Sequence, residues 1–440
     1  MKQQKISEKQ IRILWQYYLG EEVADTGELV KIIYPGRQSH DSGPDFHDAV
    51  ITINGRKVRG DVEVHTDSSH WFRHRHHCNP QYNQTVLHIV LNHTTTYPVI
   101  TEQGFPVPTV QLTPFSDRLS QNLHQSLASS FNQLPCLKTY HPKSKLVRLL
   151  AIAGRERFEL KVNRFKEKLN KDSAEQVLLS GVMRALGYAR NTKPFEELSR
   201  RLCFNFSGQL KTRNRVAMEQ AYLLGTAGLL PCQRQQRWLL KDKEATKLEK
   251  LWRAIEGNQT MNEADWQFAG VRPPNFPVRR LIALSYLLRR YHNTGLLHGI
   301  LNQVTQTSPE SGPFSLESSL LVTASGYWAK HFDFGLAAAT NSALLGKNKA
   351  AEIAINVVLP FTYAWADMVE ESELREKAGS LFCNYPRLSD NEITRHMRQQ
   401  LHIKDSTDIS LVHQQGLLHI FTTYCRDGNC QECPILIHPS

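Results

Sequence analysis

GPDFHDAVITINGRKVRGDVEVH, residues 43–65, is the stretch of sequence that decides the fold of the N-terminal part of this chain. Alternating apolar and polar residues stand on both sides of Asn54-Gly55, and this pattern predicts two antiparallel strands joined by a two-residue turn. Because side chains two residues apart share one face of a strand, Glu63 and His65 lie on the same face. Val62 and Val64 then point to the opposite face, which we expect to pack in the core.

The register of this hairpin decides which acid lies beside Glu63. A regular two-residue turn places Asp45 opposite Val64, on the apolar face, and Asp48 opposite Asp61, on the polar face. Asp45 reaches the polar face if it precedes the regular pairing, or if a bulge shifts the strand by one residue. Two glycines can provide such a bulge, Gly55 and Gly60. We favour Asp45 as the acid and keep Asp48 as the alternative.

A small α/β unit surrounds the hairpin, in the order helix, strand, strand, strand, helix, strand. Ser7 and Gln10 have the spacing of a capping box, and the apolar residues after them predict an amphipathic helix that ends near Gly20. Apolar and β-branched runs predict strands at 29–34, 85–91 and 107–112. Polar residues from Asp67 onward predict the start of a helix. We expect this unit to end near residue 115.

From residue 146 onward, apolar residues recur with the period of an α-helix. Helical patterns cover 174–186, 215–229, 235–255 and 278–291. Prolines within 272–277 separate two helices. We therefore expect an α+β protein with a small mixed-sheet domain at 1–115, a linker at 116–141 and a mainly helical region of one or two subdomains at 142–440.

The chain is basic, with a net charge of +11, and this favours polyanionic partners, either nucleic acid or an anionic membrane surface. Many of the cations fall in one helical segment: Lys143, Lys145, Arg148, Arg155, Arg157, Lys161, Arg164, Lys166, Lys168 and Lys171. The simpler interpretation is a solvated helix face, and the sharper one is a face that contacts phosphates.

The expected location is the cytoplasm. Residues 1–5 lack the apolar core of a secretory signal. The longest apolar run, 350–369, is interrupted by Glu352, Asn356, Pro360 and Asp367. These residues favour a buried helix over a membrane span, so we expect no membrane partner.

The polar face of the hairpin has the groups that metal-dependent hydrolysis of a phosphodiester needs. Asp45 and Glu63 provide carboxylates and Val64 a backbone carbonyl, and these oxygens suit Mg²⁺ or Mn²⁺. His65 is the candidate to position or deprotonate water, or to hold the phosphate. We therefore expect Asp45, Glu63 and His65 to be catalytic.

Pro44-Asp45, followed after the hairpin by Glu63-Val64-His65, resembles the signature of the PD-(D/E)XK nuclease superfamily. The expected element order over residues 7–115 is similar to the core of that superfamily. The resemblance implies a metal-dependent nuclease acting on nucleic acid. His65 departs from the pattern, which usually has lysine there. This departure favours an alternative, a nuclease fold that binds nucleic acid or a protein partner without cleavage. A second alternative is a metal-dependent hydrolase of a small phosphorylated substrate.

The chain as a whole also resembles a family of bacterial proteins catalogued as a domain of unknown function. The matching pieces are residues 43–46 and 60–65, Trp71-x-x-His74-x-His76, Arg272-Pro273-x-Asn275-Phe276-Pro277, and the segment from Tyr424-Cys425 to Cys433-Pro434. This resemblance covers nearly the full length and implies no activity.

Four histidines follow the hairpin closely, at positions 70, 74, 76 and 77. His70 and His74 are four residues apart, which places them on one face of a helix. All four are candidate metal ligands, and His74 and His76 are candidate phosphate contacts. Structural histidines held by hydrogen bonds are the simpler interpretation.

Three of the eight cysteines lie close together near the end of the chain, as Cys425-x4-Cys430-x2-Cys433. Thiolates at this spacing are typical of metal sites, and we expect a structural Zn²⁺ ion or an iron–sulfur cluster. The fourth ligand stays open, with Cys383 and His419 as candidates. The simpler interpretation is that the three cysteines are reduced thiols that bind no metal.

Overall fold

The computed structural model describes residues 6–16, 18–39, 42–112, 136, 142–202, 215–235, 237, 240–255, 259–308, 314–339, 343–404 and 409–437. The chain forms two compact units. The first combines Met1–Arg155 with Asp390–Ser440, and the second is Glu156–Ser389. The predicted boundaries at residues 115 and 142 stay a prediction, because most of the expected linker lies outside the described residues.

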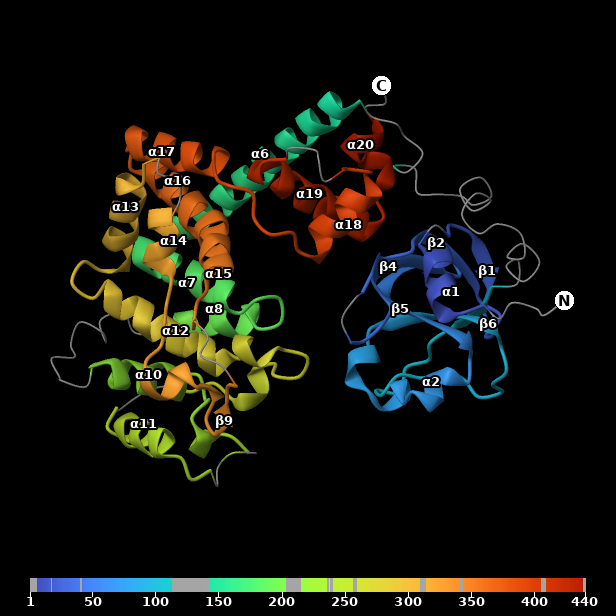
Figure 1. Cartoon of the computed structure of the whole chain (residues 1–440), viewed down its shortest axis with the longest axis horizontal. Helices are drawn as coiled ribbons and strands as arrows, with labels where there is room; N and C mark the ends of the chain where they lie inside the picture. Colours follow the sequence, from blue (N-terminus) through green and yellow to red (C-terminus); the bar gives the residue numbers. More distant parts are fainter. Residues whose placement is uncertain are drawn as a thin grey trace. The chain divides into compact units, whose positions relative to one another are not determined.

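A mixed seven-stranded sheet forms the centre of the first unit (Figure 1). Its strands are β1 (Glu21–Val23), β2 (Leu29–Tyr34), β3 (Arg37–Gln38), β4 (Phe46–Ile53), β5 (Arg56–Asp67), β6 (Thr85–Asn92) and β7 (Thr109–Gln111). The spatial order is β1-β2-β4-β5-β6-β7, with β3 paired to β4. Pairs from β1 to β5 are antiparallel, whereas β5-β6 and β6-β7 are parallel. The expected strands at 29–34, 85–91 and 107–112 are thus confirmed within one or two residues at each end.

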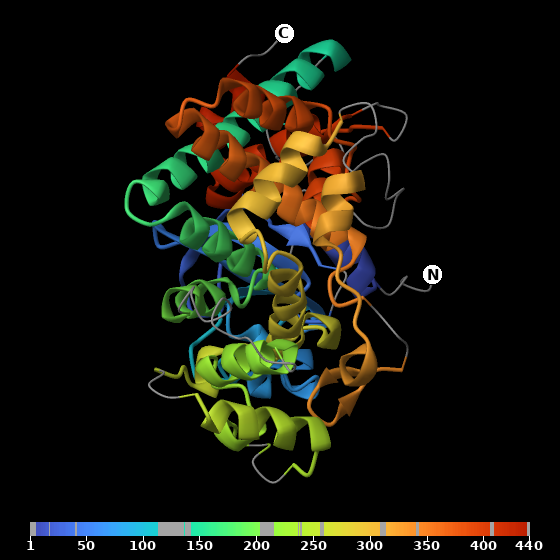
Figure 2. The same ribbon diagram turned by 90° about the vertical axis from the view of Figure 1, so that its left-hand side faces the viewer.

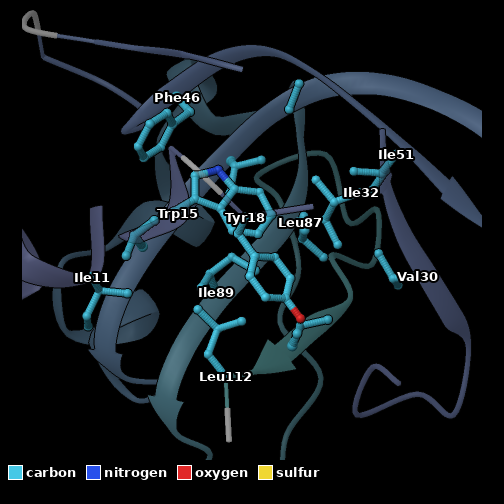
Figure 3. Packing of buried hydrophobic residues seen from close by; sticks show 14 of the residues in the cluster. Ile11, Trp15, Tyr18, Val30, Ile32, Phe46, Ile51, Leu87, Ile89 and Leu112 are labelled. Carbon is cyan, nitrogen blue, oxygen red and sulfur yellow. The ribbon is translucent and has the colours of Figure 1, made fainter. Parts of the chain in front are cut away.

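Helix α1 (Glu8–Trp15) covers one face of this sheet. The side chain of Gln10 accepts a hydrogen bond from the backbone N–H of Ser7 at 2.8 Å, which confirms the predicted cap. Ile11 and Trp15 are fully buried among the apolar side chains of β2, β4 and β6 (Figure 3). The helix ends before the predicted Gly20, since the residues that follow turn into β1.

The predicted hairpin is confirmed, and it contains a bulge. Asn54 and Gly55 both have positive φ, 48° and 81°, as a two-residue turn between twisted strands requires. The pairing of Ala49 with Gly60 follows from this turn, but Phe46 then pairs with Val62 and no longer with Glu63. One extra residue therefore lies in β4.

The bulge falls at Asp48, whose φ of 59° is left-handed, and not at either glycine that the sequence suggested. Gly55 forms the turn. Gly60 serves a different purpose, because a Cβ there would lie 2.4 Å from the carbonyl oxygen of Gln84. The absent side chain lets the start of β6 approach β5 closely.

The connection from β5 to β6 is short and rich in histidine. It contains helix α2 (His70–Arg73), as the polar cluster predicted, and two 3-10 turns, His76–Cys78 and Pro80–Tyr82. Trp71 is fully buried against Tyr82, Val99 and Val107, so a separate small core holds this crossover on the sheet.

Helices from the far end of the chain cover the other face of the sheet in the first unit. They are α18 (Glu392–Gln400), α19 (Leu411–Thr423) and α20 (Pro434–Ile437), joined by the first part of α6 (Lys143–Leu169). Tyr34 and Val50 of the sheet share a core with Leu150, Met397 and Phe421 from these helices. The first unit is thus built from both ends of the sequence.

The second unit is helical (Figures 1 and 2). Its helices are the rest of α6, α7 (Ala174–Leu186), α8 (Thr192–Arg201), α10 (Arg215–Thr226), α11 (Lys243–Arg253), α12 (Pro277–Arg290), α13 (Leu296–Gln306), α14 (Phe314–Leu320), α15 (Lys347–Ile353), α16 (Leu359–Met368) and α17 (Ser372–Cys383), with a small ribbon of β8 (His331–Asp333) and β9 (Leu336–Ala337). The mixed sheet near the N-terminus and the mostly helical remainder confirm the predicted fold class at this level.

The apolar run at 350–369 is a buried helical segment, as predicted. It forms α15, a π-helical turn at Ala354–Val358 and α16, and most of its apolar side chains are buried. Across the described part of the chain, every helix is too short or too polar to cross a lipid bilayer.

Candidate active site on strand β5

The bulge at Asp48 brings Asp45 beside Glu63. The backbone N–H of Asp45 donates to Oε2 of Glu63 at 3.0 Å, and Oδ2 of Asp45 accepts from the backbone N–H of Val64 at 3.1 Å. The three predicted residues Asp45, Glu63 and Val64 therefore meet at one place. The role of the Val64 carbonyl as a metal ligand stays a prediction.

Asp48, the alternative acid, lies elsewhere. Its Oδ2 accepts a hydrogen bond from Nε of Arg37 at 3.0 Å, and Arg37 also pairs with Glu392 of α18. Asp61, the next acid along β5, lies 3.1 Å from Nδ1 of His47. The geometry therefore selects Asp45 as the partner of Glu63.

A cation from α1 contacts the acid pair, and sequence reasoning missed it. Nη1 of Arg12 donates to Oδ1 of Asp45 at 2.7 Å. Burial raises the pKa of Asp45 despite this guanidinium. Burial, followed by the charge of Asp45, raises the pKa of Glu63 well above its usual range. Because one arginine faces two buried carboxyl groups, a further cation at this place is electrostatically favourable.

The second oxygen of Glu63 faces a group of histidines. Oε1 of Glu63 lies 3.4 Å from Nε2 of His65 and 3.3 Å from Nε2 of His76. Nδ1 of His74 lies 3.2 Å from Nε2 of His65. One donor nitrogen from each of His65, His74 and His76 falls within 4.8 Å of the other two. Of these side chains, His74 is exposed and the other two are buried.

A buried hydrogen-bonded chain holds His65 from behind. Its Nδ1 lies 2.9 Å from Nε2 of His88 on β6, and Nδ1 of His88 lies 3.4 Å from Oγ1 of Thr109 on β7. Burial, and then neighbouring imidazoles, lower the pKa of His65 and lower that of His88 to about 3. These rings are therefore neutral near pH 7. The sequence did not single out His88.

His76 is buried without a hydrogen bond. It is 7% exposed, and neither of its ring nitrogens has a hydrogen-bond partner among the described residues. Its ring stacks on Tyr82, with centroids 3.9 Å apart, and meets Trp71 edge to face. Burial, followed by the neighbouring His74 and His77, lowers its pKa to about 4. The Trp71-x-x-His74-x-His76 pattern was the sequence signal for this arrangement.

The remaining two histidines of the segment lie at the margin. Nδ1 of His70 contacts Oε1 of Glu8 at 3.2 Å, and its ring lies 5.4 Å from that of His74, in keeping with the predicted pair on one helix face. The ring of His77 packs against that of Phe72.

Four cysteines line one small apolar cavity of about 20 Å³ in the first unit. Cys425, Cys430 and Cys433 are joined there by Cys136, which the sequence did not connect with them. Burial raises the pKa of Cys433 to about 11 and raises that of Cys425 well above its usual value. Among the described residues, the group of three metal-binding donor atoms that lie within 4.8 Å of one another consists of histidine nitrogens. The sulfur atoms of these cysteines do not form such a group. A metal at the cysteines stays a prediction.

Of the two candidate fourth ligands, neither lines this cavity. Cys383 belongs to the second compact unit, and His419 lies on α19.

Some basic side chains of α6 form hydrogen bonds or ion pairs within the second unit. Nζ of Lys161 donates to Asn356 at 2.6 Å, Lys166 pairs with Asp367, and Lys168 pairs with Glu196 at 2.7 Å. These three lysines are held by partners within the unit, and a phosphate-contacting role for the other cations of α6 stays a prediction.

Comparison with known families gives one match. The model of a family described as "Protein of unknown function (DUF2851)" matches residues 8–391. A search of curated proteins and a search of solved structures found no match. The matched region contains Asp45, Glu63 and the histidine cluster, and it ends before Cys425. Since the match spans most of its length, this chain belongs to the DUF2851 family.

Proposed function

We propose that this protein is a divalent-metal-dependent phosphodiester hydrolase that acts on nucleic acid. The observation that carries this proposal is the Asp48 bulge, which lays Asp45 against Glu63 while His65 lies 3.4 Å from the same glutamate. Two carboxyl groups and an imidazole at one place could provide the metal ligands and the proton acceptor for metal-assisted attack of water on a phosphodiester.

The donor set fits a divalent cation. Asp45 and Glu63 would hold Mg²⁺ or Mn²⁺, which takes one or two carboxylates and keeps several waters. Both carboxyl groups have a raised pKa because they are buried, so a bound cation would stabilise their charged forms. The ion would activate water and offset charge on the phosphate.

His65 is suited to the proton transfer. Its ring is neutral, and the hydrogen bond to His88 leaves Nε2 facing Glu63 with a lone pair when Nδ1 carries the proton. Nε2 can then accept a proton from the attacking water. In this assignment His65 takes the position at which the PD-(D/E)XK pattern has lysine.

The element order supports the PD-(D/E)XK resemblance. Helix α1, the antiparallel strands β2, β4 and β5, the helical crossover and the parallel strand β6 follow one another in the expected sequence. Glu63 and His65 lie on β5, and Asp45 directly precedes β4. Identity with that superfamily is part of the proposal.

A polyanionic substrate agrees with the charges at the edge of this site. Arg73 and Arg75 are exposed on either side of His74, in the same short crossover. Guanidinium groups bind phosphate through paired hydrogen bonds. With the net charge of +11, these residues favour a substrate that carries phosphates, such as nucleic acid.

A cleavage assay on DNA and RNA with Mg²⁺ or Mn²⁺ tests the proposal. We expect cleavage by the wild-type protein and a loss of at least about a hundredfold in Glu63→Gln, because the variant removes a charged ligand. Asp61→Asn on the same strand is the matched control and should retain cleavage, since Asp61 pairs with His47 instead. Metal-dependent cleavage that survives in Glu63→Gln would refute the assignment.

One observation favours a second candidate function, binding without cleavage. Arg12 already provides a positive charge 2.7 Å from Asp45, at the place where a metal would lie. The same assay separates the two functions: nucleic acid that is bound but left intact with every metal supports a binding module. Cleavage by the wild-type protein excludes it.

We also propose a structural metal at the C-terminal cysteines. Cys136 is the best candidate for the fourth ligand, because it lines the same cavity as Cys425, Cys430 and Cys433. Four thiolates suit Zn²⁺ or an iron–sulfur cluster.

A further inference from the structure

The histidine cluster beside Glu63 differs chemically from the carboxyl pair. Its donors are the imidazole nitrogens of His65, His74 and His76, which meet within 4.8 Å. Imidazole nitrogen suits zinc and its neighbours among the transition metals, whereas Mg²⁺ prefers oxygen donors. The cluster therefore calls for a different ion from the one that Asp45 and Glu63 suit.

Three of the donor–donor distances agree with a tetrahedral ion. Ligand atoms at about 2.0–2.1 Å from a tetrahedral metal lie about 3.3–3.4 Å apart, whereas neighbouring ligands of octahedral Mg²⁺ at the same bond length lie about 2.9 Å apart. Glu63 Oε1 lies 3.4 Å from His65 Nε2 and 3.3 Å from His76 Nε2. His65 Nε2 and His74 Nδ1 are 3.2 Å apart.

His76 supplies independent support. A buried imidazole whose two nitrogens both lack a hydrogen bond carries a desolvation cost, so it calls for an explanation. His76 has no hydrogen-bond partner among the described residues, although its Nε2 lies 3.3 Å from Glu63 Oε1. A metal ion in this place would satisfy a nitrogen that the protein itself leaves unsatisfied.

The surroundings of His65 are those of a metal ligand. Ligating histidines usually donate their other ring N–H to a protein acceptor, which fixes the tautomer. His65 has such an acceptor in Nε2 of His88, at 2.9 Å, and His88 in turn contacts Thr109. With Nδ1 held by His88, Nε2 of His65 is the nitrogen that could bind a metal, in place of its hydrogen bond with Nδ1 of His74 at 3.2 Å.

We propose that His65, His74 and His76, with Oε1 of Glu63 beside them, form a site for one zinc-type transition-metal ion. The inference rests on the proposed function and deepens it, since Glu63 and His65 belong to both, and it assigns to the catalytic strand an ion other than Mg²⁺. With that ion bound, Nε2 of His65 would be a ligand, and the ion in place of the imidazole would activate water. Ion binding and cleavage are measured separately, so each statement can fail alone.

Metal titration of the full-length protein tests the site. The chain is freed of metal with a chelator and titrated with Zn²⁺ in competition with a chromophoric chelator. Three proteins are compared: wild type, His74→Ala and His93→Ala. His74 is exposed, so its truncation should leave the fold intact, which circular dichroism checks. His93 is the matched control, because it pairs with Asp25 and lies outside the cluster.

Outside the cysteines, we expect one Zn²⁺ ion that His93→Ala retains and that His74→Ala binds at least about a hundredfold more weakly. A thousandfold excess of Mg²⁺ should not displace it, since imidazole favours the transition metal. Co²⁺ as a spectroscopic probe separates this site from the cysteines, because thiolate ligands give intense charge-transfer absorption and imidazole ligands do not. His76→Gln should weaken binding in the same way.

Unchanged zinc stoichiometry and affinity in His74→Ala, or a wild-type protein that binds no zinc outside the cysteines, would overturn the inference. Zinc binding without cleavage by any ion leaves the site standing and refutes the proposed hydrolase. Cleavage with Mg²⁺ in a protein that binds no zinc supports the proposed hydrolase and refutes the zinc site.

Discussion

Asp45 and Glu63 lie side by side, with the backbone N–H of Asp45 donating to Oε2 of Glu63 at 3.0 Å. The turn of the hairpin sets a register that would place Asp45 on the opposite, apolar face. A single left-handed residue, Asp48 with φ of 59°, shifts the strand and reverses that outcome. The candidate site thus depends on one local backbone irregularity.

Substitution of Asp48 tests the bulge directly. Asp48→Gly and Asp48→Val both remove the ion pair with Arg37, but only valine must be forced into a left-handed conformation. We expect Asp48→Val to be less stable than Asp48→Gly by about 1–2 kcal/mol in urea denaturation. Equal stability of the two variants would show that position 48 does not hold the bulge.

Gly60 is expected to tolerate no side chain. A Cβ at this position would lie 2.3 Å from Cγ1 of Val86 and 2.4 Å from the carbonyl oxygen of Gln84. We expect Gly60→Ala to lower the free energy of unfolding by about 1–3 kcal/mol. Adding Val86→Ala should recover only part of this loss, because the backbone contact remains. Wild-type stability in Gly60→Ala would refute the close approach of β5 and β6.

His88 is expected to act on metal binding through His65 as a positioning residue. His88→Phe keeps an aromatic ring in the buried space but removes the acceptor for Nδ1 of His65. We expect about 10–100-fold weaker Zn²⁺ binding in competition titrations, with the three ligand histidines unchanged. The melting temperature of His88→Phe serves as a check on folding. A well-folded variant with wild-type affinity would contradict this role.

His396 is expected to make the first unit sensitive to acid. Burial, followed by the charge of Arg37, lowers its pKa to about 4, and its Nε2 lies 2.6 Å from the hydroxyl of Tyr34. The unfolded chain, with a pKa near 6.5, then binds more protons than the folded one between the two values. The stability that neutral His396 contributes is present above about pH 6.5 and is lost as the pH falls toward 4, by up to about 3 kcal/mol.

Urea denaturation of wild type and His396→Gln across this pH range measures that contribution. The other titrating groups are common to both proteins, so the difference isolates His396. We expect a shallower loss of stability in His396→Gln between pH 6.5 and 4. Parallel curves for the two proteins would argue against the assignment.

Cys136 is expected to contribute to metal content. If it completes the cysteine site, Cys136→Ser should lose zinc or iron that the wild-type protein retains on purification, because a tetrahedral site needs four ligands. Cys383→Ser is the control, since Cys383 is exposed and belongs to the second unit. Elemental analysis and the visible absorption of iron–sulfur clusters identify the metal. Equal metal content in the two variants would exclude Cys136 as a ligand.

Local signals in the sequence determined much of the first unit. Asn54-Gly55 fixed the hairpin because a two-residue turn needs positive φ at both positions, and the period-2 pattern placed Glu63 and His65 on one face. Ser7 and Gln10 marked the start of α1 because a cap is formed by neighbours in the chain. The histidine pattern after Trp71 also indicated the segment that contributes His74 and His76 to the histidine cluster.

Tertiary structure alone decided the contacts between residues distant in the sequence. The shift at Asp48, the ion pair of Arg12 with Asp45, the support of His65 by His88 and the arrival of Cys136 at the C-terminal thiols all join separate elements. None of them has a period or a spacing that a sequence shows, because they arise from how strands and helices pack. The sequence by itself determined which elements form and which residue types they display, whereas packing decided which of those residues meet.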